Sequence, residues 1–188
     1  IGPVSTAVLA EEILPHTHRV PVFVAGGVGS GVMMVHYLLM GAAGVQIGTK
    51  FAVSEESIAH PNFKQAMIRA KAKDAVPTSA FDPRIPVIPV RALVNEGTMD
   101  FNTLQLGLIA QLERGQISAK EAQHRLEEFW IGGLRKAAIE GDVKRGSMMA
   151  GQSVGMVKEI QSVPKIIDSL IDEAVKEAEH ILARLGRK

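Results

Sequence analysis

The chain has 188 residues, of which 46% are hydrophobic, and 21 basic residues nearly balance 20 acidic ones, giving a net charge of +1. This balance offers no electrostatic basis for binding nucleic acid or an anionic membrane, and glycine or proline interrupts each apolar stretch well before the ~20 residues of a membrane span. There is no cysteine, so disulfides, thiolate zinc sites and cysteine-ligated iron–sulfur clusters are excluded within this sequence, and we expect a cytoplasmic protein.

The beginning of the chain predicts a short helix and a polar connection. It opens with Ile-Gly-Pro in place of a methionine, which indicates a processed or truncated chain, or one observed in part. Ser5 or Thr6 can cap a helix over residues 7–14. The connection that follows contains His16 and His18, but no third ligand is close in sequence. We therefore interpret it as a solvated loop and expect no metal site.

Residues 19–51 predict a β-α-β unit. Val20–Ala25 is an apolar, β-branched run closed by two glycines, which predicts a strand buried on both faces. Val32–Leu39 has helical length and composition, and Gly41 stands where a left-handed cap would end that helix. A second strand, Gly44–Gly48, ends at a threonine. Each strand therefore carries a glycine turn at its carboxyl end.

The two turns, Gly26-Gly27 and Gly48-Thr49, predict anion binding. Glycine lets the backbone approach an oxyanion closely, and the helix after the first turn would direct free N–H groups and a partial positive charge at it. Both turns would open at the same edge of a parallel sheet, where α/β proteins bind ligands. Neither a P-loop nor a dinucleotide fingerprint is present, because Gly31 is followed by Val32 and Met33 and the glycines are spaced G-x-G-x-G. The alternative is that these glycines only form turns and allow close packing.

The middle of the chain predicts helices followed by an irregular segment. Ser54 is expected to cap a helix whose first turn carries the glutamates that follow it, and after a His-Pro pair the helix resumes over residues 62–73. Residues 75–101 contain four prolines and no clear periodicity, which is typical of a functional or covering loop.

The last third predicts two long helices and a glycine-rich junction between them. Residues 118–121 form a capping box for a helix that continues to about Glu140 and carries Trp130 on its apolar face. Another helix begins at Pro164. Between them, residues 146–153 combine glycines with exposed methionines, a pliable apolar surface that suits a flat ring or an acyl chain. An ordinary junction between helices is the alternative.

Two segments resemble one enzyme family. PVFVAGGVGSG (residues 21–31) and GVQIGTKF (44–51) are similar to the last two strands of the flavin-dependent (β/α)8 barrels of the nitronate monooxygenase family, formerly 2-nitropropane dioxygenases, which includes the type II enoyl-acyl-carrier-protein reductases. The resemblance implies an α/β fold: the carboxyl-terminal part of a (β/α)8 TIM barrel, strands seven and eight, with additional covering helices. It implies a barrel part in residues 1–74, an irregular covering loop in 75–117 and a helical segment packing on the barrel in 118–188.

The resemblance also implies a flavin site. Carried over residue by residue, the segments that hold the phosphate of FMN comprise Ala25, Gly26, Gly27, Gln46, Ile47, Gly48 and Thr49. The stretch G-S-M-M-A-G-Q is close to that of reductase-type members, where it approaches the flavin ring and the substrate pocket. This similarity implies contacts from Met149 and Gln152.

The catalytic residue that the resemblance implies lies outside this sequence. Residues 1–6 fit an I-G-x-x-(S/T)-T segment that follows the family's catalytic histidine. The histidine would therefore precede Ile1, and none of the six histidines present is assigned as catalytic. Arg91 and Asn95 stand where the family carries R-(A/V)-(L/I/V)-x-N, and we interpret Arg91 as structural.

The implied function is that of an FMN-dependent oxidoreductase similar to enoyl-acyl-carrier-protein reductase II. NAD(P)H would reduce FMN, and the flavin would reduce an enoyl thioester in fatty-acid synthesis. A nitronate monooxygenase that oxidises alkyl nitronates is the close alternative, and an inactive fragment or a barrel that binds a sugar phosphate are the others. The expected partners are a small-molecule or acyl-carrier-protein-bound substrate and the amino-terminal half of the barrel, with a homodimer as an open alternative.

Overall fold

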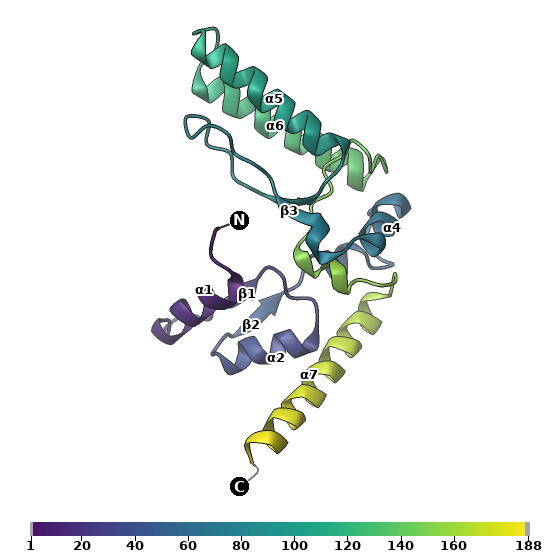
Figure 1. Ribbon diagram of the computed structural model, residues 1–188. Helices are drawn as coiled ribbons and strands as arrows, with labels where there is room; N and C mark the ends of the chain where they lie inside the picture. Colours follow the sequence, from purple (N-terminus) through teal and green to yellow (C-terminus); the bar gives the residue numbers. More distant parts are fainter. Residues whose placement is uncertain (1, 187–188) are drawn as a thin grey trace. The chain divides into compact units, whose positions relative to one another are not determined.

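The computed structural model describes residues 2–186, which form two compact units. Residues 58–152 make up the continuous unit, and residues 2–57 together with 153–186 make up the discontinuous unit. Ile1, the first residue of the segment likened to the family's, lies outside the described residues. Helices predominate over short strands in this α/β chain (Figure 1), and no helix of the described part is long and apolar enough to cross a membrane.

The discontinuous unit contains the β-α-β unit that the sequence predicts. β1 (Phe23–Ala25) pairs in parallel with β2 (Gly44–Gln46), and α2 (Gly31–Leu39) connects them. The hydroxyl of Ser30 caps α2 by accepting a backbone N–H at 3.3 Å. Gly41 follows the end of α2 with a φ of +101°, as expected for a left-handed cap.

β1 is buried on one face only, which corrects the expectation of a strand buried on both. Val24 is 6% exposed, whereas Phe23 is 62% exposed. Within the described residues β1 has a single partner strand, β2, and only its Val24 side is covered, by α1 (Thr6–Ile13) and α2. The apolar core that β1 shares with α1 and α2 is small and comprises Ala10, Leu14, Val24, Val28, Tyr37 and Ala42.

α7 (Val163–Leu185) lies beside α2 in the discontinuous unit (Figure 1). It buries one face, which carries Ile166, Leu170 and Ala174. The carboxylate of Glu56 accepts the N–H of Val163 with both oxygens at 2.9 Å. A carboxylate at this position complements the positive end of the helix, so Glu56 caps α7.

The helix expected to begin at Ser54 does not form. α3 (Thr49–Ala52) ends before Ser54, and the next helix, α4 (Pro61–Arg69), begins within one residue of the helix expected over residues 62–73 but ends earlier. The glutamate of the expected first turn, Glu56, caps α7 instead, and this long-range contact overrides the local pattern. The pattern therefore identified a carboxylate at a helix N-terminus but assigned it to the wrong helix.

The continuous unit combines a small sheet with a pair of helices. β3 (Ala75–Pro77) pairs antiparallel with β4 (Arg91–Leu93), and α5 (Glu96–Glu113) and α6 (Ala119–Ala138) pack side by side (Figure 1). The hydroxyl of Ser118 caps α6, as predicted. The core formed by α5, α6 and the loop between β3 and β4 comprises Ile85, Phe101, Leu108, Ala122, Leu126 and Trp130. Three short 3-10 turns complete the described elements: η1 (Leu14–His16), η2 (Ala72–Asp74) and η3 (Gln152–Met156).

α5 occupies much of the segment 75–117, which corrects the expectation of an irregular loop there. The helical period is hard to read because apolar side chains surround the helix. Phe101 and Leu108 are buried, whereas Met99 and Leu106 are exposed. The division of the sequence into 1–74, 75–117 and 118–188 stays a prediction.

Candidate functional site

The first glycine turn has a backbone conformation that ordinary residues rarely adopt. Gly26 has a φ of +103° and Gly27 a φ of +78°, so both lie in the left-handed region. They follow β1 directly, and a Cβ placed on Gly27 would meet no atom within 4 Å. The turn is therefore both specifically shaped and open on the side where a side chain would stand.

The second turn lies at the same end of the two-stranded sheet. Gln46 ends β2 and is paired in register with Ala25, so Ile47 and Gly48 leave the sheet next to the first turn. A Cβ on Gly48 would also meet open space, and α3 begins at the following residue. Two such turns after neighbouring parallel strands, the second leading into a short helix, are typical of phosphate sites in α/β barrels.

The N-terminus of α2 is not the free anion site that the sequence predicts. The N–H of Gly31 donates to the carboxylate of Glu173 at 2.8 Å, and the N–H of Met33 donates to the hydroxyl of Ser30 at 3.3 Å. An internal carboxylate therefore occupies the position at which an external anion would gain most from the helix. The expectation fails for these two groups because Glu173 of α7, 142 residues from Gly31 in sequence, supplies the anion at Gly31, and the cap residue Ser30 accepts from Met33. The two turns themselves remain as the candidate site.

Two charged residues at this site were missed by sequence analysis. The ammonium group of Lys50 lies 3.5 Å from the carbonyl oxygen of Gly29, which brings a cation to the same end of the sheet. Its position directly after Thr49 could have suggested this role. Glu173 carries no such signal, because its helix is remote in sequence from the turn that it contacts.

The other predicted contact residues, Met149 and Gln152, belong to the continuous unit. Met149 forms an isolated antiparallel bridge with Ala92 of β4: the N–H of Leu93 donates to the carbonyl of Met148 at 2.9 Å, and the N–H of Ala150 donates to the carbonyl of Arg91 at 3.0 Å. Met148 is 2% exposed, which corrects the expectation that both methionines are exposed.

Met149 is partly buried and packs against the core of α5 and α6, and Gln152 is exposed at the start of η3. Contact of either residue with a flavin or a substrate stays a prediction.

Arg91 and Asn95 have structural partners. The guanidinium of Arg91 donates to the carbonyl of Ala75 at 2.7 Å, across the β3–β4 pair. The amide of Asn95 donates to the carbonyls of Val143 and Gly146, at 2.9 and 2.8 Å, while its oxygen caps α5. These contacts agree with the structural interpretation of Arg91. Among residues 2–186, no three His, Cys, Asp or Glu side chains converge as a metal site would require.

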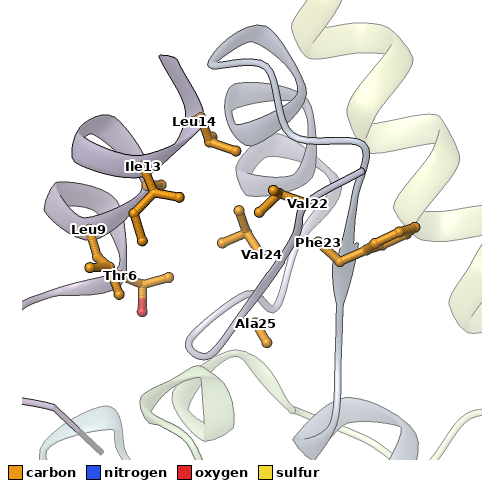
Figure 2. A pocket seen from close by; sticks show the side chains of 9 residues that line it. Thr6, Leu9, Ile13, Leu14, Val22, Phe23, Val24 and Ala25 are labelled. Atoms are coloured by element: carbon orange, nitrogen blue, oxygen red, sulfur yellow. The ribbon is translucent and has the colours of Figure 1, made fainter. Parts of the chain in front are cut away.

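An apolar pocket of about 270 Å³ lies between α1 and β1. Figure 2 shows Leu9, Ile13 and Leu14 facing Val22 and Val24 across it, with Phe23 pointing away. Thr6 supplies the one hydroxyl among its lining side chains, and no lining residue is charged. The pocket can therefore bury apolar groups but carries no acid, base or nucleophile beyond that hydroxyl.

Comparison with known proteins gives consistent matches. The model of the nitronate monooxygenase family matches residues 2–173. A probable nitronate monooxygenase of Staphylococcus saprophyticus is 30% identical over 167 residues, covering 88% of this chain and 41% of that protein. The (3aS,4S,5R,7aS)-5-hydroxy-7a-methyl-1-oxo-octahydro-1H-indene-4-carboxyl-CoA dehydrogenase of Rhodococcus jostii is 24% identical over 198 residues, covering 93% of this chain and 55% of that protein.

Solved structures give the same result. FabK from Thermotoga maritima is 32% identical with a TM-score of 0.79, covering 98% of this chain and 53% of that one. The nitroalkane oxidase of Streptomyces ansochromogenes shares the fold at 22% identity with a TM-score of 0.65, covering 95% of this chain and 46% of that one. The chain thus spans about half the length of the relatives that it matches. Since the family model covers nearly the whole sequence, the chain belongs to the nitronate monooxygenase family.

Proposed function

We propose that this chain is the carboxyl-terminal part of an FMN-dependent oxidoreductase with a (β/α)8 barrel, in which β1 and β2 are strands seven and eight. The observation that carries the proposal is the pair of glycine turns at the carboxyl ends of two adjacent parallel strands, the second leading into a short helix. A barrel binds its ligands at this end of its strands, and a phosphate group commonly lies between the last two turns.

The shape and charge of the turns fit the phosphate of FMN. Gly27 and Gly48 leave open the space that side chains would fill, so backbone N–H groups can approach an oxyanion closely. Lys50 adds a positive charge at this end of the sheet. The residues proposed to hold the cofactor are Ala25, Gly26, Gly27, Gln46, Ile47, Gly48 and Thr49.

When bound, FMN supplies hydride transfer, and the residues of the chain supply binding and orientation. The backbone of the two turns would donate to the phosphate and fix the position of the cofactor. Gln46, whose side chain is exposed at the end of β2, would offer an amide to the polar part of the cofactor. Met149 and Gln152 are proposed to contact the flavin ring or the substrate.

The proposed partner is the amino-terminal half of the barrel. Among the described residues, β1 pairs with β2 alone, and the pocket between α1 and β1 is apolar, as an interior covered by further strands would be (Figure 2). The relatives are about twice as long as this chain. The catalytic histidine would belong to that half, directly before the segment beginning at residue 1.

For the substrate, we propose an enoyl thioester reduced by NAD(P)H through FMN. The likeness to FabK over 98% of the chain, at 32% identity, supports this assignment, as does the G-S-M-M-A-G-Q stretch. Nitronate oxidation is the second candidate, supported by the probable nitronate monooxygenases that match at 28–31% identity.

The test uses the full-length protein that carries this sequence. We expect flavin absorption bands between 300 and 550 nm and tighter binding of FMN than of riboflavin. With the flavin bound, NAD(P)H-dependent loss of an enoyl thioester would support the reductase, and oxygen-dependent consumption of an alkyl nitronate without NAD(P)H would support the monooxygenase. A protein that binds inorganic phosphate or a sugar phosphate but neither flavin would contradict the proposal.

A further inference from the structure

In the glycine-rich segment between β1 and α2, residues 26–31, the first two glycines have open space beside them and the later residues are closely packed. A Cβ on Gly27 would meet no atom within 4 Å, and one on Gly26 would meet only the hydroxyl of Thr6, at 3.5 Å. Val28, by contrast, is 2% exposed, and a Cβ on Gly29 would lie 2.8 Å from the sulfur of Met156 and 2.9 Å from the Cβ of Ser153. The residues immediately after the turn are therefore closely packed, and Gly29 has no room for a side chain.

The close packing continues at Gly31, the first residue of α2, where α7 crosses α2. A Cβ on Gly31 would collide with the carbonyl oxygen of Leu170 and lie 2.6 Å from the backbone nitrogen of Ala174. Helices α2 and α7 are thus in backbone contact at this point, and Figure 1 shows them side by side. Only glycine permits so close an approach.

Glu173 closes this contact with a hydrogen bond. Its Oε2 accepts the N–H of Gly31 at 2.8 Å, and its Oε1 accepts the hydroxyl of Ser169, one turn earlier on α7, at 3.3 Å. Both contacts are partly buried, so they are shielded from competition by water. A carboxylate that accepts a backbone N–H at a helix N-terminus is among the stronger hydrogen-bonded arrangements in proteins.

We propose that Glu173 is a positioning residue for the phosphate turn, an inference that rests on the proposed function. Residues 26–31 begin with the Gly26-Gly27 turn and end at Gly31, the first residue of α2. By accepting the N–H of Gly31, Glu173 fixes the far end of this segment. The turn is then held in its left-handed conformation before a ligand arrives, which removes an ordering cost from binding. Because the same carboxylate occupies the N-terminus of α2, it also confines a phosphate to the two turns.

Glu177 provides a matched control on the same pair of helices. It lies one turn after Glu173 on α7, and its Oε1 is 3.1 Å from Nε2 of His36 on α2. The pair joins α7 to the second half of α2, beyond the first residues that Glu173 holds. Substitution at Glu177 therefore perturbs the packing of the two helices without releasing Gly31.

The experiment measures the dissociation constants of FMN and of riboflavin for the full-length apoprotein by fluorescence titration. The dissociation constant of riboflavin divided by that of FMN isolates the contribution of the phosphate to binding, because the two ligands differ only in that group. We expect Glu173→Ala to lower this ratio about tenfold or more, as the loss of a charged hydrogen bond would. Glu173→Asp keeps the charge but shortens the side chain, so it should lower the ratio in the same direction.

Glu173→Gln keeps an acceptor oxygen and should stay within about threefold of the wild type, since a neutral hydrogen bond can still hold the N–H of Gly31 in place. Glu177→Gln should leave the ratio unchanged. If Glu173→Ala does not fold, the Asp and Gln variants decide the question. The positioning role would be overturned if the ratio of the two dissociation constants were unchanged in the Ala and Asp variants, or if FMN and riboflavin both bound more weakly by the same factor. A wild-type ratio of one would instead overturn the proposed function, before any variant is made.

Discussion

The two glycine-rich stretches of the chain, residues 26–31 and 146–152, use glycine for different purposes. At Gly27 an added Cβ would meet nothing within 4 Å. At Gly146 it would collide with the backbone nitrogen of Ala137 and lie 2.5 Å from the carbonyl oxygen of Asp142. The first stretch thus leaves backbone exposed at its Gly26-Gly27 turn and is closely packed only from Gly29 onward, whereas the second packs backbone against backbone at its first glycine.

Hydrogen bonding follows the same division. In the second stretch, the N–H of Ser147 donates to the carbonyl of Gly133 at 2.7 Å, and Met148 accepts from the neighbouring strand β4. The polar backbone groups there are used within the protein and are not offered to a ligand. A glycine-rich sequence is therefore a candidate anion site only where the space beside the glycine is open, and the comparison favours the first stretch.

The largest effect is expected from Gly146→Ala, which should destabilise the fold by about 3 kcal/mol or more because two backbone segments would have to move apart. The measurement is the free energy of unfolding in urea. Gly107→Ala is the matched control: Gly107 lies in α5 with nothing within 4 Å of its Cβ position, so it should gain about 0.5–1 kcal/mol. Equal stabilities for the two variants would contradict the packing role of Gly146.

Asn95→Ala should cost about 2 kcal/mol, because it leaves the carbonyls of Val143 and Gly146 without their donor and removes the cap of α5. This variant tests how the second stretch is held at its beginning. Asn95→Asp separates the two roles, since the carboxylate can still cap the helix but cannot donate. Urea unfolding should show the Asp variant at least as destabilised as the Ala variant. If the Asp variant were as stable as the wild type, only the capping of α5 by Asn95, and not its donation to the two carbonyls, would contribute to stability.

Gly48→Ala should leave stability within about 0.5 kcal/mol of the wild type, since the backbone there has a φ of −95° and the space is open. The added methyl would stand where the phosphate is proposed to bind, so FMN should bind about tenfold more weakly, or ~1.4 kcal/mol, while riboflavin is unaffected. Fluorescence titration with both ligands checks this. Unchanged FMN affinity would remove the second turn from the proposed site.

The sequence predicts the β-α-β unit because its information is local. The β-branched run before Gly26, the helical stretch after Ser30 and the left-handed Gly41 each act within a few residues. The helix and the cap are confirmed, and the run before Gly26 forms a strand over its last three residues. The family was recognisable for the same reason, since its motifs are short and continuous in sequence.

What the sequence did not predict depends on partners far away along the chain. The occupation of the N-terminus of α2 follows from Glu173, and the absence of a helix at Ser54 follows from the capping of α7 by Glu56. The burial of Met148 follows from its pairing beside β4. No local pattern contains these contacts, because helix propensity and capping rules do not specify which distant element supplies the partner.

The smallest effect is expected from Asp82→Asn, in a loop of the continuous unit that belongs to neither glycine stretch. The guanidinium of Arg84 donates to both oxygens of Asp82, with distances of 3.0 Å from its Nε, and these bonds lower the pKa of the Asp82 carboxyl. A lowered pKa means that the ion pair contributes stability above the pKa of the unfolded chain, and that the contribution is lost as the pH falls through the pKa of the folded state.

Arg84 is exposed, and water and salt weaken such a pair, so the variant should unfold like the wild type at pH 7. Its amide oxygen can still accept the backbone N–H of Arg84, which keeps the turn. Urea unfolding at pH 7 and pH 3 checks this: any difference between the two proteins should be largest at pH 7 and should become smaller as the pH falls. A difference as large as that of Asn95→Ala would show that the loop, and not only the backbone contacts of the second glycine stretch, holds the continuous unit together.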